Sequence, residues 1–182
     1  MTKNIAVLVG SIRQDSLNRK LALVLEKLAE GKLKFDYVQM DDLPYYNDDR
    51  WNDPPASVLR FKEQIARADG VLVITPEYNR SYPGILRNAF DWGSRPFGKG
   101  VWKHKPAATT GTSPGAIGTA VAQTALRSDL VNLSMHVSQF PEAYIQWKPE
   151  VYGDDGSVYD DYTRKFLQGF VDGFAEFIAK LG

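Results

Sequence analysis

The sequence predicts an α/β fold, an open parallel sheet of five strands with helices on both faces. Apolar runs at Ile5–Val9 and Gly70–Thr75 do not alternate with polar residues, as expected for strands buried on both faces. Helical patterns separate the strand patterns, and most of the connections are short turns. No internal repeat or composition break interrupts the chain, so a single domain over residues 1–182 is expected.

The first half of the chain alternates strand and helix patterns. After the strand Ile5–Val9, apolar residues recur at helical spacing from Leu17 to Leu28, and Gly31 is the expected helix stop. Phe35–Val38 is the second predicted strand. Residues 41–55 hold five aspartates and three prolines and are expected to form a long loop. The prolines that end this loop favour the start of a helix whose apolar stripe is Val58, Phe61 and Ile65.

The second half repeats the alternation after the third strand at Gly70–Thr75. A helix is expected from about Ile85 to Trp92, because Pro83 suits the first turn of a helix. Residues 93–100 and 139–157 are expected to be irregular. The remaining predicted elements are strands at Pro106–Thr110 and Val131–Val137, a helix carrying Ile117, Val121 and Leu126, and an amphipathic helix from Phe166 to Leu181.

Composition excludes several kinds of partner and site. Lys plus Arg and Asp plus Glu are each 22, so the charge balance gives no sign of a nucleic-acid or anionic membrane partner. No apolar stretch is long enough to span a bilayer, and the N-terminal Met-Thr-Lys-Asn shows no signal-peptide pattern. The absence of cysteine excludes thiol catalysis, disulfides and thiolate metal sites. These features are those expected of a cytoplasmic protein.

The stretch Gly10–Asn18 joins the first strand to the first helix and carries groups that suit a phosphate. The hydroxyls of Ser11 and Ser16 and the backbone N–H groups can donate hydrogen bonds, and a helix N-terminus favours negative charge. Arg13 adds a charged group that can bind bidentately. An ordinary connection with Ser16 as helix cap and Arg13 in solvent would have the same composition.

Two further polar turns follow the third and fourth strands, at residues 76–84 and 111–115. In a sheet of order 2-1-3-4-5 the first, third and fourth strands are neighbours, and ligands bind beyond their carboxyl ends. We therefore expect the three turns to converge on one crevice, which strengthens the case for a phosphate at the first turn.

Motifs of other enzyme classes are missing. The first turn lacks G-x-G-x-x-G, and neither G-x-x-x-x-G-K-[ST] nor G-x-S-x-G occurs, which excludes three common nucleotide-binding and hydrolase motifs. His104 lies between two lysines and is expected at the surface, whereas His136 is expected in the core or at an interface. Two histidines give no support for a histidine metal site or a catalytic triad.

The sequence G-S-I-R-Q-D-S-L-N at Gly10–Asn18 resembles the phosphate loop G-S-x-R-x-x-S-x-N of the NAD(P)H-dependent FMN reductase family. Thr75–Asn79, with Pro83-Gly84 and Asn88–Trp92, resembles the second signature of that family, T-P-E-Y-N…P-G…K-N-A-[IF]-D-W, with Arg87 in place of the more frequent Lys. The resemblance covers essentially the whole chain and is greatest to the quinone, chromate and ferric reductases. It implies a flavodoxin-like three-layer sandwich.

The resemblance also implies that FMN binds across the three turns. The FMN phosphate is then expected at Ser11, Arg13, Ser16, Leu17 and Asn18. The isoalloxazine is expected along Pro76, Glu77, Tyr78 and Asn79, with the last three offering backbone N–H groups and Ser113 at the other edge. Arg80, Tyr82 and Arg95 are candidates for the substrate pocket.

The implied activity is that of an oxidoreductase that passes electrons from NADH or NADPH to quinones, chromate, ferric complexes or similar small molecules by a ping-pong mechanism. No metal and no catalytic acid or base is implied, because the chemistry takes place at the flavin. Family members usually form homodimers or homotetramers, and the candidates for a pocket wall at such an interface are Arg80, Tyr82, Trp102, Trp147 and the loop Tyr45–Trp51.

Two other functions stay open at this point: an electron carrier of the flavodoxin kind and a redox-sensing FMN-binding protein, neither of which turns over pyridine nucleotide. The neutral charge balance and Arg13 both count against a flavodoxin, since flavodoxins are usually acidic and favour a threonine-rich phosphate loop.

Overall fold

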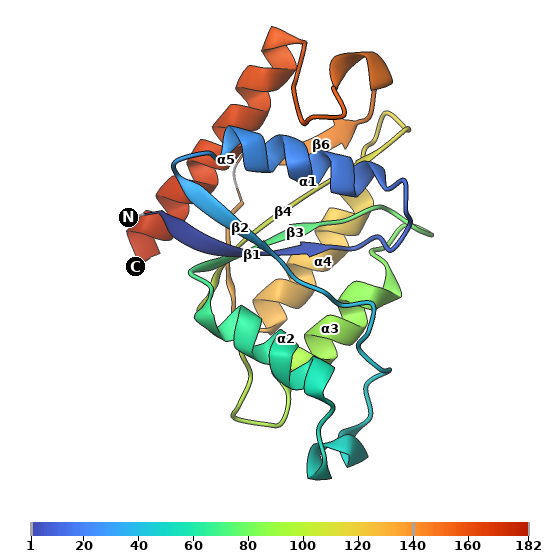
Figure 1. The fold of residues 1–182 in the computed structure, drawn as a ribbon, viewed down its shortest axis with the longest axis vertical. Helices are drawn as coiled ribbons and strands as arrows, with labels where there is room; N and C mark the ends of the chain where they lie inside the picture. The colour runs from blue at the N-terminus through green and yellow to red at the C-terminus, as the bar shows by residue number, and fades with distance from the viewer. Residues whose placement is uncertain (1, 140, 182) are drawn as a thin grey trace.

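A computed structural model describes residues 2–139 and 141–181, and its central feature is a parallel sheet of six strands within these residues (Figure 1). Met1, Phe140 and Gly182 lie outside the described residues. The strand order is β2-β1-β3-β4-β5, with β6 also paired to β4, which confirms the predicted order 2-1-3-4-5. The strands are β1 (Lys3–Val9), β2 (Leu33–Tyr37), β3 (Gly70–Ile74), β4 (Pro106–Ser113), β5 (His136–Val137) and β6 (Ala143–Gln146).

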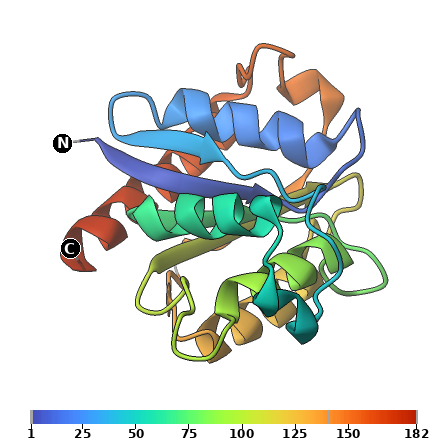
Figure 2. The same cartoon turned by 60° about the horizontal axis from the view of Figure 1, so that its bottom comes forward.

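Helices cover both faces of the sheet, as predicted. They are α1 (Leu17–Leu28), α2 (Ala56–Arg67), α3 (Gly84–Ser94), α4 (Ala120–Asn132) and α5 (Asp161–Leu181), with 3-10 turns at Asp48–Asn52 and Pro149–Val151. Figure 2 shows α2, α3 and α4 on one side of the sheet, while α1 and α5 lie on the other. Successive side chains of β1 alternate between the two cores: Ile5 and Val7 pack with α1 and α5, whereas Ala6 and Leu8 face α2 and α3. Burial on both faces is the reason for the uninterrupted apolar runs.

The predicted fifth strand at Val131–Val137 is wrong over most of its length. Helix α4 continues to Asn132, and a turn with Ser134 at a φ of 61° follows it, so only His136–Val137 pairs with the start of β4. The rest of β4 pairs with β6, which arises from the stretch expected to be irregular. The apolar run was ambiguous because Leu126 and Leu130 continue the buried stripe of the helix into it.

Three side chains are placed differently from the expectation. His136 is exposed rather than part of the core, and its ring stacks on that of His104 with centroids 5.5 Å apart. Ile117 precedes α4, and both Ile117 (55% exposed) and Val121 (40%) face solvent, so the buried stripe of α4 is formed by other residues. The apolar residues of this short segment do not by themselves predict which face of α4 is buried, because the turn before α4 sets the rotation of the helix about its axis.

Trp102 does not line an interface, since it is fully buried and donates a hydrogen bond to the Phe90 carbonyl at 3.2 Å. A Cβ at Gly93 would lie only 2.4 Å from the Trp102 ring, so glycine is required for this close packing on α3. Trp51 packs edge-on against Trp92 at 5.2 Å and Trp147 stacks on Tyr152 at 4.2 Å. These two tryptophans therefore cover edges of the core.

Helix α5 confirms the predicted amphipathic pattern, because one stripe is buried against the sheet while the rest of its surface is largely polar. The buried residues are Leu167, Phe170, Val171, Phe174 and Ile178. Across residues 2–139 and 141–181, no helix combines the length and the apolar character that crossing a membrane requires.

Candidate functional site

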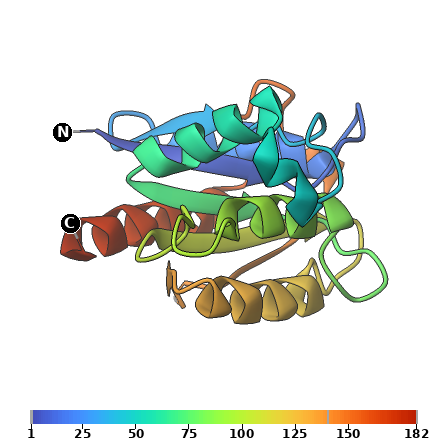
Figure 3. The ribbon, with the colours of Figure 1, turned by 90° about the horizontal axis from the view of Figure 1, so that it is seen from below.

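The three predicted turns lie at the carboxyl edge of the sheet, and Figure 3 shows the turns after β1 and β3 at the same end of the molecule. Parallel pairing places Val9 beside Ile74, so β1 and β3 end at the same level, whereas β4 continues three residues past Thr110, the partner of Ile74, to Ser113. The N–H of Gly10 donates to the Ile74 carbonyl at 2.8 Å. A Cβ at Gly10 would lie 2.7 Å from Leu86, so glycine permits this close approach of the first turn to α3.

The first turn keeps two polar side chains without protein partners. Ser16 caps α1, its hydroxyl oxygen accepting the Arg19 N–H at 3.3 Å. Ser11 is only 6% exposed, and its hydroxyl forms no hydrogen bond to any residue in the described part of the chain. The Arg13 guanidinium is exposed and likewise forms no hydrogen bond or ion pair there. Together with the unpaired N–H groups of the first turn of α1, these groups form an anion-binding surface.

Asn18, also predicted to contact phosphate, is engaged by the third turn. Its side-chain amide donates to the Thr112 carbonyl at 3.0 Å, and its amide oxygen accepts the Thr112 N–H at 3.0 Å. Both hydrogen bonds are buried, so Asn18 fixes the start of α1 against the end of β4. Any contact of Asn18 with a phosphate stays a prediction.

The second turn is a two-residue hairpin closed by Tyr78 and Ser81, which exchange backbone hydrogen bonds of 2.9 and 3.0 Å. Its central residues, Asn79 and Arg80, have φ angles of 52° and 62°, the left-handed conformation typical of a type I′ turn. The expectation that Tyr78 offers a free N–H is therefore wrong, because that N–H donates to Ser81. The N–H groups of Glu77 and Asn79 have no partner within the described residues.

The Glu77 carboxylate connects the second turn to helix α4. One oxygen accepts the N–H groups of Val121 and Ala122, each at 3.1 Å, and the other accepts Arg80 at 2.9 Å. The Glu77 side chain is only 10% exposed. Thr119, at the N-cap of α4, forms no side-chain capping bond, so Glu77 supplies both the missing acceptor and a negative charge at the helix N-terminus. No sequence pattern indicates this contact, because Glu77 and Val121 are 44 positions apart in the chain.

The Ser113 hydroxyl forms its hydrogen bonds within the third turn. Its hydroxyl lies 2.6 Å from the Gly118 carbonyl and 3.3 Å from that of Gly115, so it closes the turn on itself. Gly118 has a φ of 63°, and a Cβ there would lie 2.7 Å from the backbone of Ile145. The position therefore requires glycine. The Ser113 oxygen can still accept a hydrogen bond from a ligand, and that contact stays a prediction.

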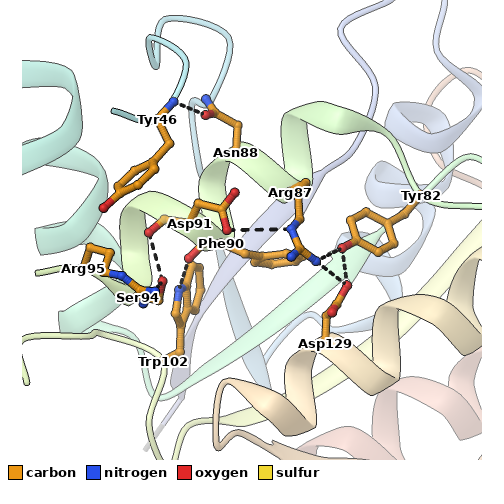
Figure 4. Close-up of polar contacts among 10 residues, drawn as sticks. All are labelled: Tyr46, Tyr82, Arg87, Asn88, Phe90, Asp91, Ser94, Arg95, Trp102 and Asp129. Carbon is orange, nitrogen blue, oxygen red and sulfur yellow. Dashed lines mark hydrogen bonds and ion pairs between the residues drawn. The ribbon is translucent and has the colours of Figure 1, made fainter. Parts of the chain in front are cut away.

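The candidates for a substrate pocket are not brought together. Tyr82 precedes α3 and its hydroxyl donates to the Asp129 carboxylate on α4, whereas Arg95 is the residue after the last turn of α3 (Figure 4). A helix of 11 residues is about 16 Å long, so the two residues lie at opposite ends of it. Arg80 is paired with Glu77. A shared role of Tyr82 and Arg95 in a substrate pocket stays a prediction.

Sequence analysis missed the role of Arg87, which Figure 4 shows between Tyr82, Asp129 and Asp91. The guanidinium donates to Asp129 at 3.0 Å and to the Tyr82 oxygen at 3.2 Å, and it lies 3.7 Å from Asp91. Burial, followed by the hydrogen bond to Asp129, raises the pKa of Tyr82 above its ordinary value. The spacing of Arg87 and Asp91 is typical of a helical ion pair and could have indicated part of this cluster.

Comparisons with known proteins agree on one family. The model of the NADPH-dependent FMN reductase family matches residues 3–147. The chain is 47% identical to a 2-hydroxy-1,4-benzoquinone reductase of a Burkholderia species over 178 residues, covering 98% of this chain and 97% of that protein. It is 48% identical to a quinone reductase of Pseudomonas putida over 176 residues, with coverage of 96% and 94%. The solved structure of FerB, a flavoenzyme NAD(P)H:(acceptor) oxidoreductase from Paracoccus denitrificans, matches with a TM-score of 0.98 and 58% identity over 100% of both chains.

Proposed function

This chain belongs to the NADPH-dependent FMN reductase family, and from that membership we propose that it transfers electrons from NADH or NADPH to quinones through FMN held by the three turns. The relatives named as quinone reductases are similar over nearly their entire length, which supports quinones as acceptors. The observation that carries the proposal is the pair of unpartnered groups, Ser11 and Arg13, at an edge where two further turns converge.

The residues of the first turn fit the phosphate of FMN. Ser11 is only 6% exposed, and its hydroxyl has no partner within the described residues, so it is free to donate a hydrogen bond to a phosphate oxygen. The Arg13 guanidinium supplies positive charge, and the N-terminus of α1 adds N–H donors through Leu17 and Asn18. Ser16 is placed to assist because its hydroxyl hydrogen is not used by the capping bond.

The second turn fits the edge of an isoalloxazine ring. The free N–H groups of Glu77 and Asn79 can donate to the oxygen and nitrogen atoms of such a ring, while Pro76 limits the motion of the backbone before them. The Tyr78 ring is exposed and can cover one face of the cofactor. Bound FMN would accept the hydride of NAD(P)H and pass its two electrons to the acceptor, chemistry that none of these side chains performs.

The remaining residues act by holding the turns in place. Asn18 fixes the first turn to the third, and Glu77 fixes the second turn to α4, so the donors keep their relative positions. The site does not need a catalytic acid or base. We expect NAD(P)H and the acceptor to use the same open side of the site in turn, which corresponds to a ping-pong mechanism.

The proposal extends to chromate and ferric complexes, because a site with exposed groups such as Arg13 and Tyr78 makes few demands on acceptor shape. It also includes a homodimer or homotetramer in the cytoplasm. Exposed apolar side chains at Tyr78, Ile117 and Val121 lie on segments connected by Glu77 and support an interface beside the site.

Absorbance spectroscopy and steady-state kinetics test the proposal together. The purified protein is expected to carry a flavin spectrum and to oxidise NADH or NADPH with 1,4-benzoquinone, giving parallel double-reciprocal plots. Bound FMN without pyridine-nucleotide turnover would instead support an electron carrier or a redox sensor. Absence of FMN binding by the apoprotein would overturn the assignment of the three turns.

A further inference from the structure

A cavity of about 490 Å³ opens on the β2 side of the first turn, and its lining also includes Ile85 at the start of α3. It lies at the carboxyl ends of β1 and β2, below the first half of α1. Its volume is within the range of small-molecule sites. The residues that line it most directly are Val9, Ser11, Ile12, Arg19, Leu23 and Asp41.

The polar groups of this cavity lack protein partners. The Arg19 guanidinium forms no hydrogen bond or ion pair within the described residues, although its backbone N–H is used by Ser16. The Asp41 carboxylate likewise forms none, whereas the adjacent Asp42 accepts two hydrogen bonds from Arg60 at 2.8 Å. The cavity therefore presents one cation and one anion that are available to a ligand, while the Ser11 hydroxyl in its lining is assigned to the FMN phosphate.

The walls of the cavity suit a flat, partly apolar group. Ile12 and Leu23 expose large apolar side chains on one side, and the ring of Tyr37 lies at the end of β2. The Tyr37 hydroxyl donates to Glu26 at 2.8 Å, so this hydrogen bond restrains the ring. A purine base can cover such a surface, while its sugar and phosphate groups reach the polar residues.

We propose that this cavity receives the adenosine end of NADH and NADPH, with Asp41 accepting the ribose hydroxyls of NADH and Arg19 pairing with the 2′-phosphate of NADPH. The inference rests on the proposed function, because it assigns the part of the pyridine nucleotide that does not react. In Rossmann folds, whose first turn carries G-x-G-x-x-G, an acidic side chain after the second strand binds a ribose 2′-hydroxyl, and an arginine nearby accommodates a 2′-phosphate. This chain lacks that glycine motif, so the comparison extends only to the pair of charges beside the second strand. This cavity holds one group of each kind.

The opposite charges predict opposite effects on the two nucleotides. Arg19 attracts the dianionic 2′-phosphate, and Asp41 repels it while accepting hydrogen bonds from the free hydroxyl. The cavity should therefore accept both nucleotides, each recognised by a different residue. Removing one charge should shift the preference toward the other nucleotide.

Isothermal titration calorimetry of the FMN-loaded protein tests this with two probes that lack nicotinamide, ADP-ribose and 2′-phospho-ADP-ribose. We expect R19A to weaken binding of the phosphorylated probe about tenfold or more and to change that of ADP-ribose little. We expect D41N to weaken ADP-ribose binding several-fold and to leave or tighten binding of the phosphorylated probe. Lys103→Ala, which removes an exposed lysine before β4 at the opposite edge of the sheet, is the matched control for both and should change neither.

Kinetics of the same variants separate the adenosine end from the reacting end. The KM for NADPH should rise in R19A and that for NADH in D41N, while the KM for reduced nicotinamide mononucleotide should stay unchanged in both. Leu23→Trp, which fills the mouth of the cavity, should raise the KM for both dinucleotides and spare the mononucleotide. The two exposed-charge variants keep the test valid if L23W folds poorly.

Three results would overturn the inference. Equal binding of both probes by wild type, R19A and D41N would show that neither charge contacts the nucleotide. Undetectable binding of both probes by wild type would show that the cavity does not hold adenosine. Loss of FMN in R19A would assign the cavity to the cofactor instead. In the first two cases quinone reduction by NAD(P)H would be unaffected, so the proposed function would stand without this inference.

Discussion

The Glu77 carboxylate accepts the backbone N–H of Val121 at 3.1 Å, across 44 positions of the sequence. This contact caps α4 with a residue of the second turn, because Thr119 forms no side-chain capping bond of its own. The turn after β3 and the helix after β4 therefore hold their relative positions through one side chain. Since both segments border the proposed flavin site, we expect the contact to affect both stability and cofactor binding.

Glu77→Ala is expected to lower the free energy of unfolding by about 1–2 kcal/mol, the usual cost of a lost helix cap. It should also weaken FMN binding, because the second turn and α4 lose their connection. Urea unfolding of the apoprotein and FMN titration measure the two effects. Glu63→Ala, at an exposed position of α2, is the control, and equal behaviour of the two variants would contradict the capping role.

Arg13→Ala is expected to weaken FMN binding by about 1.5–3 kcal/mol, since it removes a charged donor to a phosphate. Titration of the apoprotein with FMN measures the change in affinity. Arg50→Ala removes an equally exposed arginine from the 3-10 turn Asp48–Asn52 and should leave the affinity unchanged. A wild-type affinity in the Arg13 variant would exclude it as a phosphate ligand.

Asn18→Ala is expected to destabilise the protein by about 2–4 kcal/mol, because two buried hydrogen bonds to Thr112 are lost. The backbone N–H and carbonyl of Thr112 are then left unpaired. Chemical denaturation measures this cost. Asn18→Asp keeps the acceptor for the Thr112 N–H but replaces the amide donor with a buried charge, so this variant should also be less stable than wild type. If the alanine variant were as stable as wild type, the hydrogen-bonded pair would not connect the first and third turns as described.

The lowered pKa of the Asp155 carboxyl leads to a prediction about the stability of the protein at acid pH. Hydrogen bonds from the Ser157 hydroxyl and then from Lys27 hold the pKa of the Asp155 carboxyl at about 2, below its ordinary value of 3.8. A carboxyl whose pKa is lowered by folding contributes stability above its unfolded pKa, and this contribution is lost as pH falls through the folded pKa. The Tm of Asp155→Asn should therefore fall less between pH 4 and pH 2 than that of wild type.

The control for the acid experiment is Asp154→Asn, since the Asp154 side chain forms no hydrogen bond within the described residues. Its Tm should follow the wild-type pH dependence. A parallel pH dependence in Asp155→Asn and wild type would mean that the exposed carboxylate is screened by solvent and contributes nothing measurable.

Much of the fold could be predicted because its signals are local. The strands at the start of the chain and at Gly70–Ile74 were visible as apolar runs, and helical spacing identified α1, α2 and α5. The region of β5 and β6 could not be predicted in the same way. Val131 and Leu133 fit either a strand or the end of a helix, and β6 is defined only by its pairing with β4.

The candidate site, too, could be predicted only in part from the sequence. The residue types of the three turns predicted where a ligand with a phosphate would bind, and turn chemistry is a property of short segments. Which hydrogen-bond donors remain free to bind a ligand is not a property of short segments. Tyr78 loses its N–H to Ser81, Asn18 pairs with Thr112, and Tyr82 bonds to Asp129, none of which the motifs indicated.

By itself, the sequence predicted the family and an alternation of strands and helices, because periodicity and turn motifs are encoded over a few neighbouring residues; the site that it places at the three turns stays a prediction. Only the tertiary structure decided that Glu77 caps α4, that Tyr82 and Arg95 lie apart, and that Arg19 and Asp41 border one cavity. Those relationships depend on packing between segments distant in the chain. Hydrogen-bond partners and unpaired charges are therefore set by the folded geometry and not by residue type.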